Sequence, residues 1–302
     1  MAILDGPDVR VVDTPHGRVR VRDTGGDGPV VLLVHSLLLD PDLYAAVVPP
    51  LVARGHRCLV PELPLGGHAL PLRAGADLTP PGLARLLVEV LDAVGVPRAH
   101  VVGVDTGGAL AQLLMARHRD RVGAVVLTAC DAYDQFPPST PVGLLFRPLF
   151  LPVVLGVAAQ ALRLAAVRRL LLLRPVTHRG AGDDVLRRWT RPLRDPLVRR
   201  DVRAAFRAMH PRHTEAAAEA NRDFPRPVLV AWGDDDRLFP RRLGERLARE
   251  LPDARLVTLP DCAAFAALDR PELLADLIHE LIGEHVRAAV PPAGGGTPPP
   301  PA

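Results

Sequence analysis

The segment 101–108 combines an acidic side chain with glycines in a spacing typical of a catalytic turn. It reads Val-Val-Gly-Val-Asp-Thr-Gly-Gly, and Asp105 stands at the centre of a Gly-x-nucleophile-x-Gly pattern between an apolar run and a helical pattern. So sharp a strand-to-helix turn requires the small residues Gly103 and Gly107 and holds the central side chain above the sheet. The carboxylate of Asp105 is therefore a candidate nucleophile, and the N–H of Thr106 is a candidate donor to a developing oxyanion. An ordinary aspartate helix cap after a glycine would produce the same letters.

Short β-branched runs alternate with helical patterns, which predicts a doubly wound α/β sheet. Residues 18–22 alternate charged and apolar side chains, as a half-buried strand does, whereas the later runs are almost wholly apolar, as in strands covered on both faces. The predicted strands are 9–14, 18–22, 30–34, 58–60, 101–102, 124–128, 228–232 and 255–259, and two of the predicted helices are 81–94 and 109–117.

The alternation stops at Asp134 and resumes at Val228, and the gap predicts a helical insertion. We expect residues 1–134 and 223–290 to form the α/β core and residues 135–222 to form a helical lid. The lid should face the carboxyl edge of the sheet, where ligands bind in open α/β folds. Residues 291–302 are rich in proline and glycine and are predicted to be a disordered tail.

All 37 basic residues of the 302 are arginines, so the absence of lysine excludes a Schiff-base mechanism. The lid carries 16 arginines against 6 acidic residues, a balance of +10. Such a segment can attract anionic lipid or nucleic acid, but we favour a solvated outer face on an apolar lid, and 4% aromatic residues offer little for base stacking. We therefore expect a small apolar partner and no nucleic acid, do not favour membrane contact through the lid, and expect a monomer or homodimer.

Three cysteines, Cys58, Cys130 and Cys262, lie far apart, and the chain contains no CxxC, HExxH or GxGxxG motif. This pattern predicts no metal and no cofactor, and reduced thiols in a cytoplasmic protein. The N-terminus lacks the basic and apolar regions of a secretory signal. The charge-free stretch 148–162 is too short to span a bilayer.

Four further segments accompany the Asp105 motif in a defined order: 30–36 (Val-Val-Leu-Leu-Val-His-Ser), 60–64 (Val-Pro-Glu-Leu-Pro), 228–240 (Val-Leu-Val-Ala-Trp-Gly-Asp-Asp-Asp-Arg-Leu-Phe-Pro) and 259–265 (Leu-Pro-Asp-Cys-Ala-Ala-Phe). Over residues 8–286 the chain thereby resembles the α/β-hydrolase superfamily, in the branch with an aspartate nucleophile that includes haloalkane dehalogenases and epoxide hydrolases. The resemblance implies a mostly parallel eight-stranded sheet with the lid inserted after the sixth strand.

The resemblance also implies roles for individual residues. Asp105 would be the nucleophile and Asp236 the supporting acid, while the N–H groups of Leu37 and Thr106 would form the oxyanion hole. The substrate pocket is expected to be formed by His35, Ser36, Tyr133, Trp189, Ala264 and Phe265.

One position departs from the family pattern. The family reads Asp-Cys-Gly-His-Phe where this chain reads Asp-Cys-Ala-Ala-Phe, so Ala264 occupies the position of the catalytic histidine. In the family this histidine activates the water that hydrolyses an ester on the aspartate, and losing a positioned base slows such a step by about 10²–10⁴-fold. Candidate substitutes are His68, His210 and His213.

Two acidic residues after the sixth predicted strand, Asp131 and Asp134, are further candidates for an acid or base, or for caps of the first lid helix.

No single activity of the branch carries over intact. Thr106 stands where haloalkane dehalogenases have tryptophan and fluoroacetate dehalogenases have arginine, and Tyr44 and Tyr133 do not provide the lid tyrosine pair of epoxide hydrolases. The sequence therefore predicts a hydrolase acting on a small, largely apolar ester, epoxide or alkyl halide, with an activity altered by the missing histidine. The alternative is a non-hydrolytic ligand-binding or receptor-like protein of the same fold.

Overall fold

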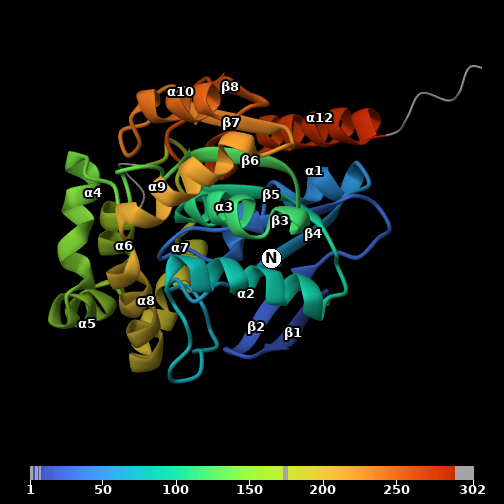
Figure 1. The fold of residues 1–302 in the computed structure, drawn as a ribbon. Helices are drawn as coiled ribbons and strands as arrows, with labels where there is room; N and C mark the ends of the chain where they lie inside the picture. The colour runs from blue at the N-terminus through green and yellow to red at the C-terminus, as the bar shows by residue number, and fades with distance from the viewer. Residues whose placement is uncertain (1–2, 4–5, 7, 173–175, 290–302) are drawn as a thin grey trace, which may run out of the picture.

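The computed structural model describes residues 3, 6, 8–172 and 176–289, and its centre is one eight-stranded sheet (Figure 1). The strand order is β1-β2-β4-β3-β5-β6-β7-β8; β1 with β2 and β2 with β4 pair antiparallel, and the other pairs are parallel. The predicted fold class is confirmed. The strands are β1 (Val9–Thr14), β2 (Gly17–Asp23), β3 (Val30–Val34), β4 (Arg57–Pro61), β5 (Ala99–Asp105), β6 (Val122–Cys130), β7 (Val228–Gly233) and β8 (Ala254–Leu259).

Helices cover the sheet, and α3 packs on β5 and β6, α10 on β7 and β8, and α12 against α1 and β6. The core helices are α1 (Val48–Ala53), α2 (Pro80–Ala93), α3 (Thr106–Arg117), α10 (Arg241–Glu250), α11 (Ala266–Asp269) and α12 (Pro271–Ala289). Between β6 and β7 the chain forms α4 (Pro141–Phe146), α5 (Pro152–Ala161), α6 (Ala165–Leu172), α7 (Asp183–Thr190), α8 (Pro196–Ala208) and α9 (Pro211–Ala220). Helices α4, α5, α6 and α8 gather at one end of the sheet in Figure 1, whereas α9 packs against α3.

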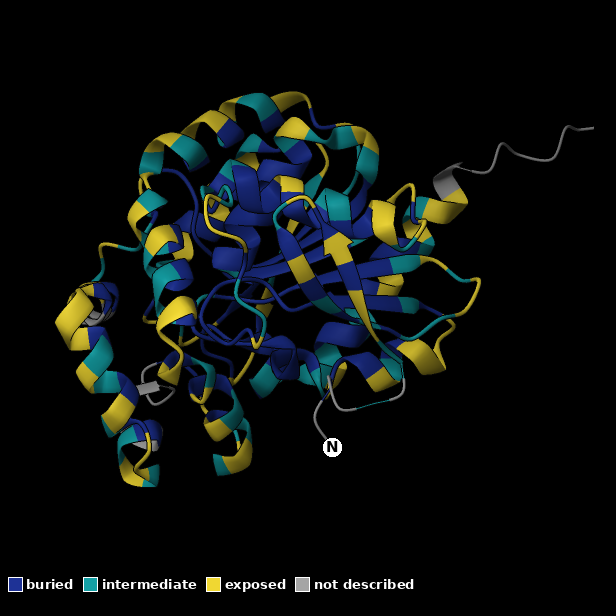
Figure 2. Cartoon of the chain, turned by 90° about the horizontal axis from the view of Figure 1, so that it is seen from below, coloured by how far each residue is buried: buried dark blue, intermediate teal, exposed yellow. Residues whose placement is uncertain are grey.

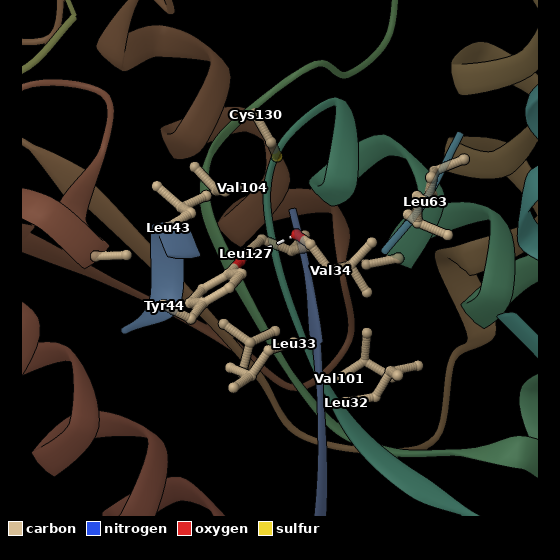
Figure 3. Close-up of a cluster of buried hydrophobic side chains, with 14 of the residues drawn as sticks. Leu32, Leu33, Val34, Leu43, Tyr44, Leu63, Val101, Val104, Leu127 and Cys130 are labelled. Atoms are coloured by element: carbon tan, nitrogen blue, oxygen red, sulfur yellow. Dashed lines mark hydrogen bonds between the residues drawn. The ribbon is translucent and has the colours of Figure 1, made fainter. Parts of the chain in front are cut away.

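The apolar runs become the buried centre of the molecule. All nine residues of β6 are buried, and the sheet forms the dark interior of Figure 2 beneath helices with exposed outer faces. Figure 3 shows Leu32, Leu33 and other aliphatic side chains in contact within this core. Tyr44 adds an anchor there, because its buried hydroxyl donates to the carbonyl of Val34 at 2.9 Å (Figure 3). The β3 end that leads to the candidate site is therefore held firmly.

Helix α3 begins at Thr106, three residues before the predicted start at 109. The two glycines that the helix includes, Gly107 and Gly108, are unfavourable in an isolated helix. In the fold, a Cβ at Gly107 would lie 2.2 Å from the carbonyl oxygen of Val34, and one at Gly108 would lie 2.2 Å from the Cβ of Cys130. Close packing of α3 on the neighbouring strands therefore requires both glycines.

Two further expectations concern the ends of the chain and the membrane. The predicted disordered tail, 291–302, lies outside the described residues. Within the described part of the chain, no helix combines the length and hydropathy needed to cross a bilayer.

Candidate active site

Asp105 lies at the sharp turn between β5 and α3. Its backbone has φ 51° and ψ −124°, a conformation that costs a non-glycine residue about 1–3 kcal/mol. A Cβ at Gly103 would lie 2.4 Å from the carbonyl oxygen of Gly107, so the two arms of the turn touch. The strained turn places the Asp105 side chain at the carboxyl edge of the parallel strands, where a binding site is expected in an open α/β sheet.

A cavity lies above Asp105, between the sheet edge and the lid. The centres of water-sized molecules have about 100 Å³ of space inside it. Its polar lining comes from Asp105, Thr106, Asp131 and, at an exposed position, Arg147. The remaining lining is formed by Leu37, Leu38, Leu39, Pro137, Pro138, Gly143, Phe150, Val176, Phe206, Met209, Leu238 and Phe265. The space is smaller than the about 150 Å³ of an apolar cavity that holds benzene, so it fits a small molecule, and its lining suits a largely apolar one.

The Asp105 carboxylate retains some exposed surface while lying deep beneath the lid. Burial raises its pKa, and the side chains of Ser36 and Asp131, together with the backbone and hydroxyl of Thr106, act in the opposite direction. The Ser36 hydroxyl is buried beside the carboxylate without reaching hydrogen-bonding geometry. These polar neighbours favour the charged form that a nucleophile needs.

Two backbone amides adjoin the same site. Leu37 lines the cavity, and its N–H has no hydrogen-bond partner among the described residues. The N–H of Thr106, at the first position of α3, faces the Asp105 carboxylate and lowers its pKa. Backbone N–H groups that face a cavity, from a loop as for Leu37 or from a helix start as for Thr106, are suited to a developing negative charge. Leu37 and Thr106 both line the cavity with Asp105 and therefore remain candidates for an oxyanion hole.

Asp236 lies in the loop after β7, close enough for the charge of Asp105 to raise its pKa. Its Oδ1 accepts from the N–H groups of Leu238 at 2.8 Å and Phe239 at 3.0 Å. Its Oδ2 is buried and has no hydrogen-bond partner among the described residues. Burial is the main cause that raises the pKa of this carboxyl to about 7. One oxygen is therefore fixed and the other stays open to a partner.

Ala264 lies in the β8–α11 loop, is completely buried, and is not among the residues that line the cavity. This loop is joined to the loop that carries Asp236: the N–H of Asp235 donates to the carbonyl of Cys262 at 3.1 Å, and Asp234 accepts from the N–H of Cys262 at 3.1 Å. Phe265, the next residue, does line the cavity as predicted. The loop that carries Ala264 is therefore hydrogen-bonded to the loop that carries Asp236.

No histidine lines the cavity among the residues described. His68 is buried, and its Nε2 lies 3.4 Å from Asp201 Oδ2. His210 caps α9 by accepting from the N–H of Arg212, and His213 lies on the same helix. None of these three candidate substitutes lines the cavity: His68 contacts Asp201, His210 caps α9, and His213 lies next to Arg212 on that helix.

Trp189 also lies away from the cavity, contrary to prediction. Its indole is completely buried, and its Nε1 donates to Asp40 Oδ1 at 2.7 Å. The neighbouring Arg188 forms an ion pair with Asp42 at 2.6 Å. Helix α7 thus fastens the lid to the loop after β3, the loop that carries Leu37. A tryptophan with an apolar body and one donor is suited to such an anchor.

We expect Trp189→Phe to lower the free energy of unfolding by about 1–3 kcal/mol, because it removes one of the two donors to the buried Oδ1 of Asp40, the other being the N–H of Asp42 at 2.7 Å. Adduct formation at Asp105 should keep its rate per folded molecule. Chemical denaturation and intact-protein mass spectrometry measure the two effects. If the variant instead loses reactivity and keeps its stability, Trp189 takes part in substrate binding or catalysis and the anchoring role is wrong.

Three more predicted pocket residues occupy other places. His35 is fully buried; its Nδ1 contacts the carbonyl of Ser36 at 2.9 Å and its Nε2 accepts from the N–H of Leu63, while burial lowers its pKa to about 4. The ring of Tyr133 packs under the guanidinium of Arg246 at 3.7 Å. Ser36 is close to Asp105 but does not line the cavity. His35 therefore supports the loop and is no base for the reaction.

The structure adds residues to the site that the sequence did not single out as pocket residues. Phe150 and Phe206 stack with ring centroids 3.8 Å apart and form part of the wall. Asp131 was noted only as following the sixth strand, and it lines the cavity, whereas Asp134 is exposed and does not. The signal for Asp131 was its place directly after an apolar strand, because the carboxyl ends of parallel strands meet at one edge.

No group of three or more potential metal ligands occurs in the described part of the chain. The three cysteines are free and buried, and burial raises the pKa of Cys58 and of Cys262 to about 12.

The fold, the strained turn and the cavity together define the class of protein. A family model described as the alpha/beta hydrolase fold matches residues 29–271, so the chain belongs to this family. It is 28% identical over 294 residues to haloalkane dehalogenase 2 of Mycobacterium bovis, covering 91% of this chain and 94% of the relative. It is 25% identical over 276 residues to a 2-hydroxy-6-oxononadienedioate/2-hydroxy-6-oxononatrienedioate hydrolase of Cupriavidus pinatubonensis, covering 88% and 91%. The crystal structure of an ancestral haloalkane dehalogenase superimposes with a TM-score of 0.77 at 25% identity, covering 93% of this chain and all of the other.

The protein is therefore an enzyme of the α/β-hydrolase superfamily, related to haloalkane dehalogenases and other hydrolases.

Proposed function

We propose that this protein hydrolyses a small, largely apolar alkyl halide, epoxide or ester, with Asp105 as its nucleophile. The observation that carries the proposal is the placement of the Asp105 carboxylate on a strained strand-to-helix turn, facing a cavity with a mostly apolar lining. Similarity to haloalkane dehalogenases supports attack on a saturated carbon.

The reaction has two steps. With a halide or epoxide, one oxygen of Asp105 bonds to the substrate carbon and the halide or epoxide oxygen leaves with the bonding electron pair, so that an ester remains on Asp105. With an ester substrate, the same oxygen bonds to the acyl carbon, the alcohol oxygen leaves with its electron pair, and an anhydride remains on Asp105 for water to hydrolyse. Water then attacks the carbonyl carbon of the ester on Asp105, while the amides of Leu37 and Thr106 stabilise the charge on its oxygen. The second step proceeds without the histidine that the family resemblance implies, because Ala264 occupies its position.

The test is incubation with 1-bromobutane, 1,2-epoxybutane or p-nitrophenyl acetate in water labelled with oxygen-18, at enzyme in excess over the probe. We expect a stoichiometric adduct on the peptide that contains Asp105, and its release should place the label in the Asp105 carboxylate. Intact-protein and peptide mass spectrometry measure both. If oxygen-18 appears in the product of the first turnover and not in Asp105, the Asp105 carboxylate activates water for direct attack on the substrate and forms no covalent ester.

A ligand-binding protein without hydrolytic activity is the second candidate function. The absence of a histidine from the cavity, among the residues described, favours it. Saturable binding of all three probes with neither adduct nor product would support this function and overturn the first.

A further inference from the structure

Asp131 is a buried carboxyl group with no role in the two steps as described. It follows β6 directly, lines the cavity and is 1% exposed. Its Oδ1 has no hydrogen-bond partner among the described residues. Burying a carboxyl oxygen without a hydrogen-bond partner costs free energy. We therefore expect a water molecule or the substrate to be the partner of this oxygen.

The side chain of Thr106 connects Asp131 to Asp105. Its Oγ1 lies 3.4 Å from Asp105 Oδ1 and 3.4 Å from Asp131 Oδ2. A hydroxyl carries one proton and therefore donates to only one of the two at a time. The two carboxyl groups thus neighbour each other, share one hydroxyl and line one cavity.

The position of Asp131 is held by α3. Gln112 Nε2 donates to the carbonyl of Asp131 at 2.8 Å and to that of Gly108 at 3.1 Å. These bonds connect the end of β6 to the helix that begins beside Asp105. The separation of the two carboxyl groups is therefore set by rigid elements, as a catalytic pair requires.

We propose that Asp131 is the general base that activates the water which hydrolyses the ester on Asp105. This inference rests on the proposed function and assigns the base that the chain lacks at position 264. In the resting enzyme the proton resides on Asp131 and the negative charge on Asp105. Asp105 is the more stable anion, since it adjoins the backbone amide of Thr106 and the side chain of Ser36 in addition to the hydroxyl that it shares with Asp131.

Formation of the ester changes the charge next to Asp131. In the resting enzyme, burial and then the charge of Asp105 hold the pKa of Asp131 well above its usual value. The ester is neutral, so the second cause disappears and Asp131 gives up its proton more readily. That proton passes to the epoxide oxygen or leaves with the halide. The other ionisable groups facing this region are Cys130 and Asp236, and Arg147 lines the same cavity.

The atoms and electrons then balance. The Asp131 carboxylate takes one proton of the water, and the oxygen of that water bonds to the carbonyl carbon of the ester. The intermediate expels the alkoxide, which takes the proton of the newly formed Asp105 carboxyl group. The products are the alcohol, an Asp105 carboxylate and a protonated Asp131, which is the resting state.

The test compares Asp131→Asn with the matched variant Asp134→Asn, an exposed residue outside the cavity. With 1-bromobutane, we expect both variants to form the Asp105 adduct. Hydrolysis of the adduct should be slower by about 10²–10⁴-fold in Asp131→Asn only, so that its adduct accumulates. Adduct formation and decay are followed by intact-protein mass spectrometry, and thermal unfolding shows that each variant is folded.

A second measurement uses the unaltered protein. Decay of its adduct should accelerate as pH rises, because Asp131 must be ionised to accept a proton, and this rise should be absent in Asp131→Asn. Equal decay rates in the two proteins, or a pH-independent decay in the unaltered protein, would overturn the role of Asp131 and leave Asp105 as nucleophile. Absence of both adduct and product would overturn the nucleophile and the base together.

Discussion

Replacing Asp105 by asparagine is expected to prevent adduct formation and to lower product formation on the order of 10⁴-fold or more, as removal of a catalytic nucleophile does. The amide of asparagine keeps the shape of the carboxylate but cannot form the ester. Asparagine also tolerates positive φ better than most residues, so the turn at φ 51° should persist. Adduct mass and product formation with 1-bromobutane measure the effect.

The control for this variant is again Asp134→Asn, which changes an exposed carboxylate in the same way. We expect Asp105→Asn to be at least as stable to denaturant as the unaltered protein, because it removes one of two neighbouring buried carboxyl groups. Product formation that survives in Asp105→Asn would show that another group attacks the substrate.

The second large effect is expected from Ala264→His, which should accelerate hydrolysis of the Asp105 ester by about 10²-fold. The open Oδ2 of Asp236 offers an acceptor for one nitrogen of the new imidazole, and the two loops are already joined by hydrogen bonds. An imidazole titrates near neutral pH, so it is a better-matched base than a deeply buried carboxyl group. Decay of the preformed adduct measures the gain.

Ala264→Gln is the matched control, because it adds a polar side chain of comparable size without a base. In the Asp131→Asn background, Ala264→His should restore decay of the adduct whereas Ala264→Gln should not. If Ala264→His folds normally and leaves decay unchanged in both backgrounds, the imidazole does not reach the ester, and the assignment of position 264 is wrong.

Much of the architecture follows from local patterns in the chain. Strands buried on both faces must be nearly all apolar, so runs such as β6 are recognisable from composition alone. The turn at Asp105 is equally local, because its glycines are required by contacts within a few residues and with the adjacent strands. Leu37, Thr106 and Phe265 follow from the same logic: each adjoins a strand or helix end at the carboxyl edge, and all three line the cavity with Asp105.

Only the tertiary structure decided which side chains of the lid and loops meet at Asp105. Trp189 and His68 have the chemistry of site residues, but packing places them against Asp40 and Asp201. Conversely, Asp131 gains its potential role from an approach to Asp105 across neighbouring strands. A residue type records which interactions a side chain is able to make, whereas the packing of distant segments determines which of them it makes. The sequence by itself therefore determined the sheet, the turn and the candidate nucleophile, and the fold alone decided what surrounds them.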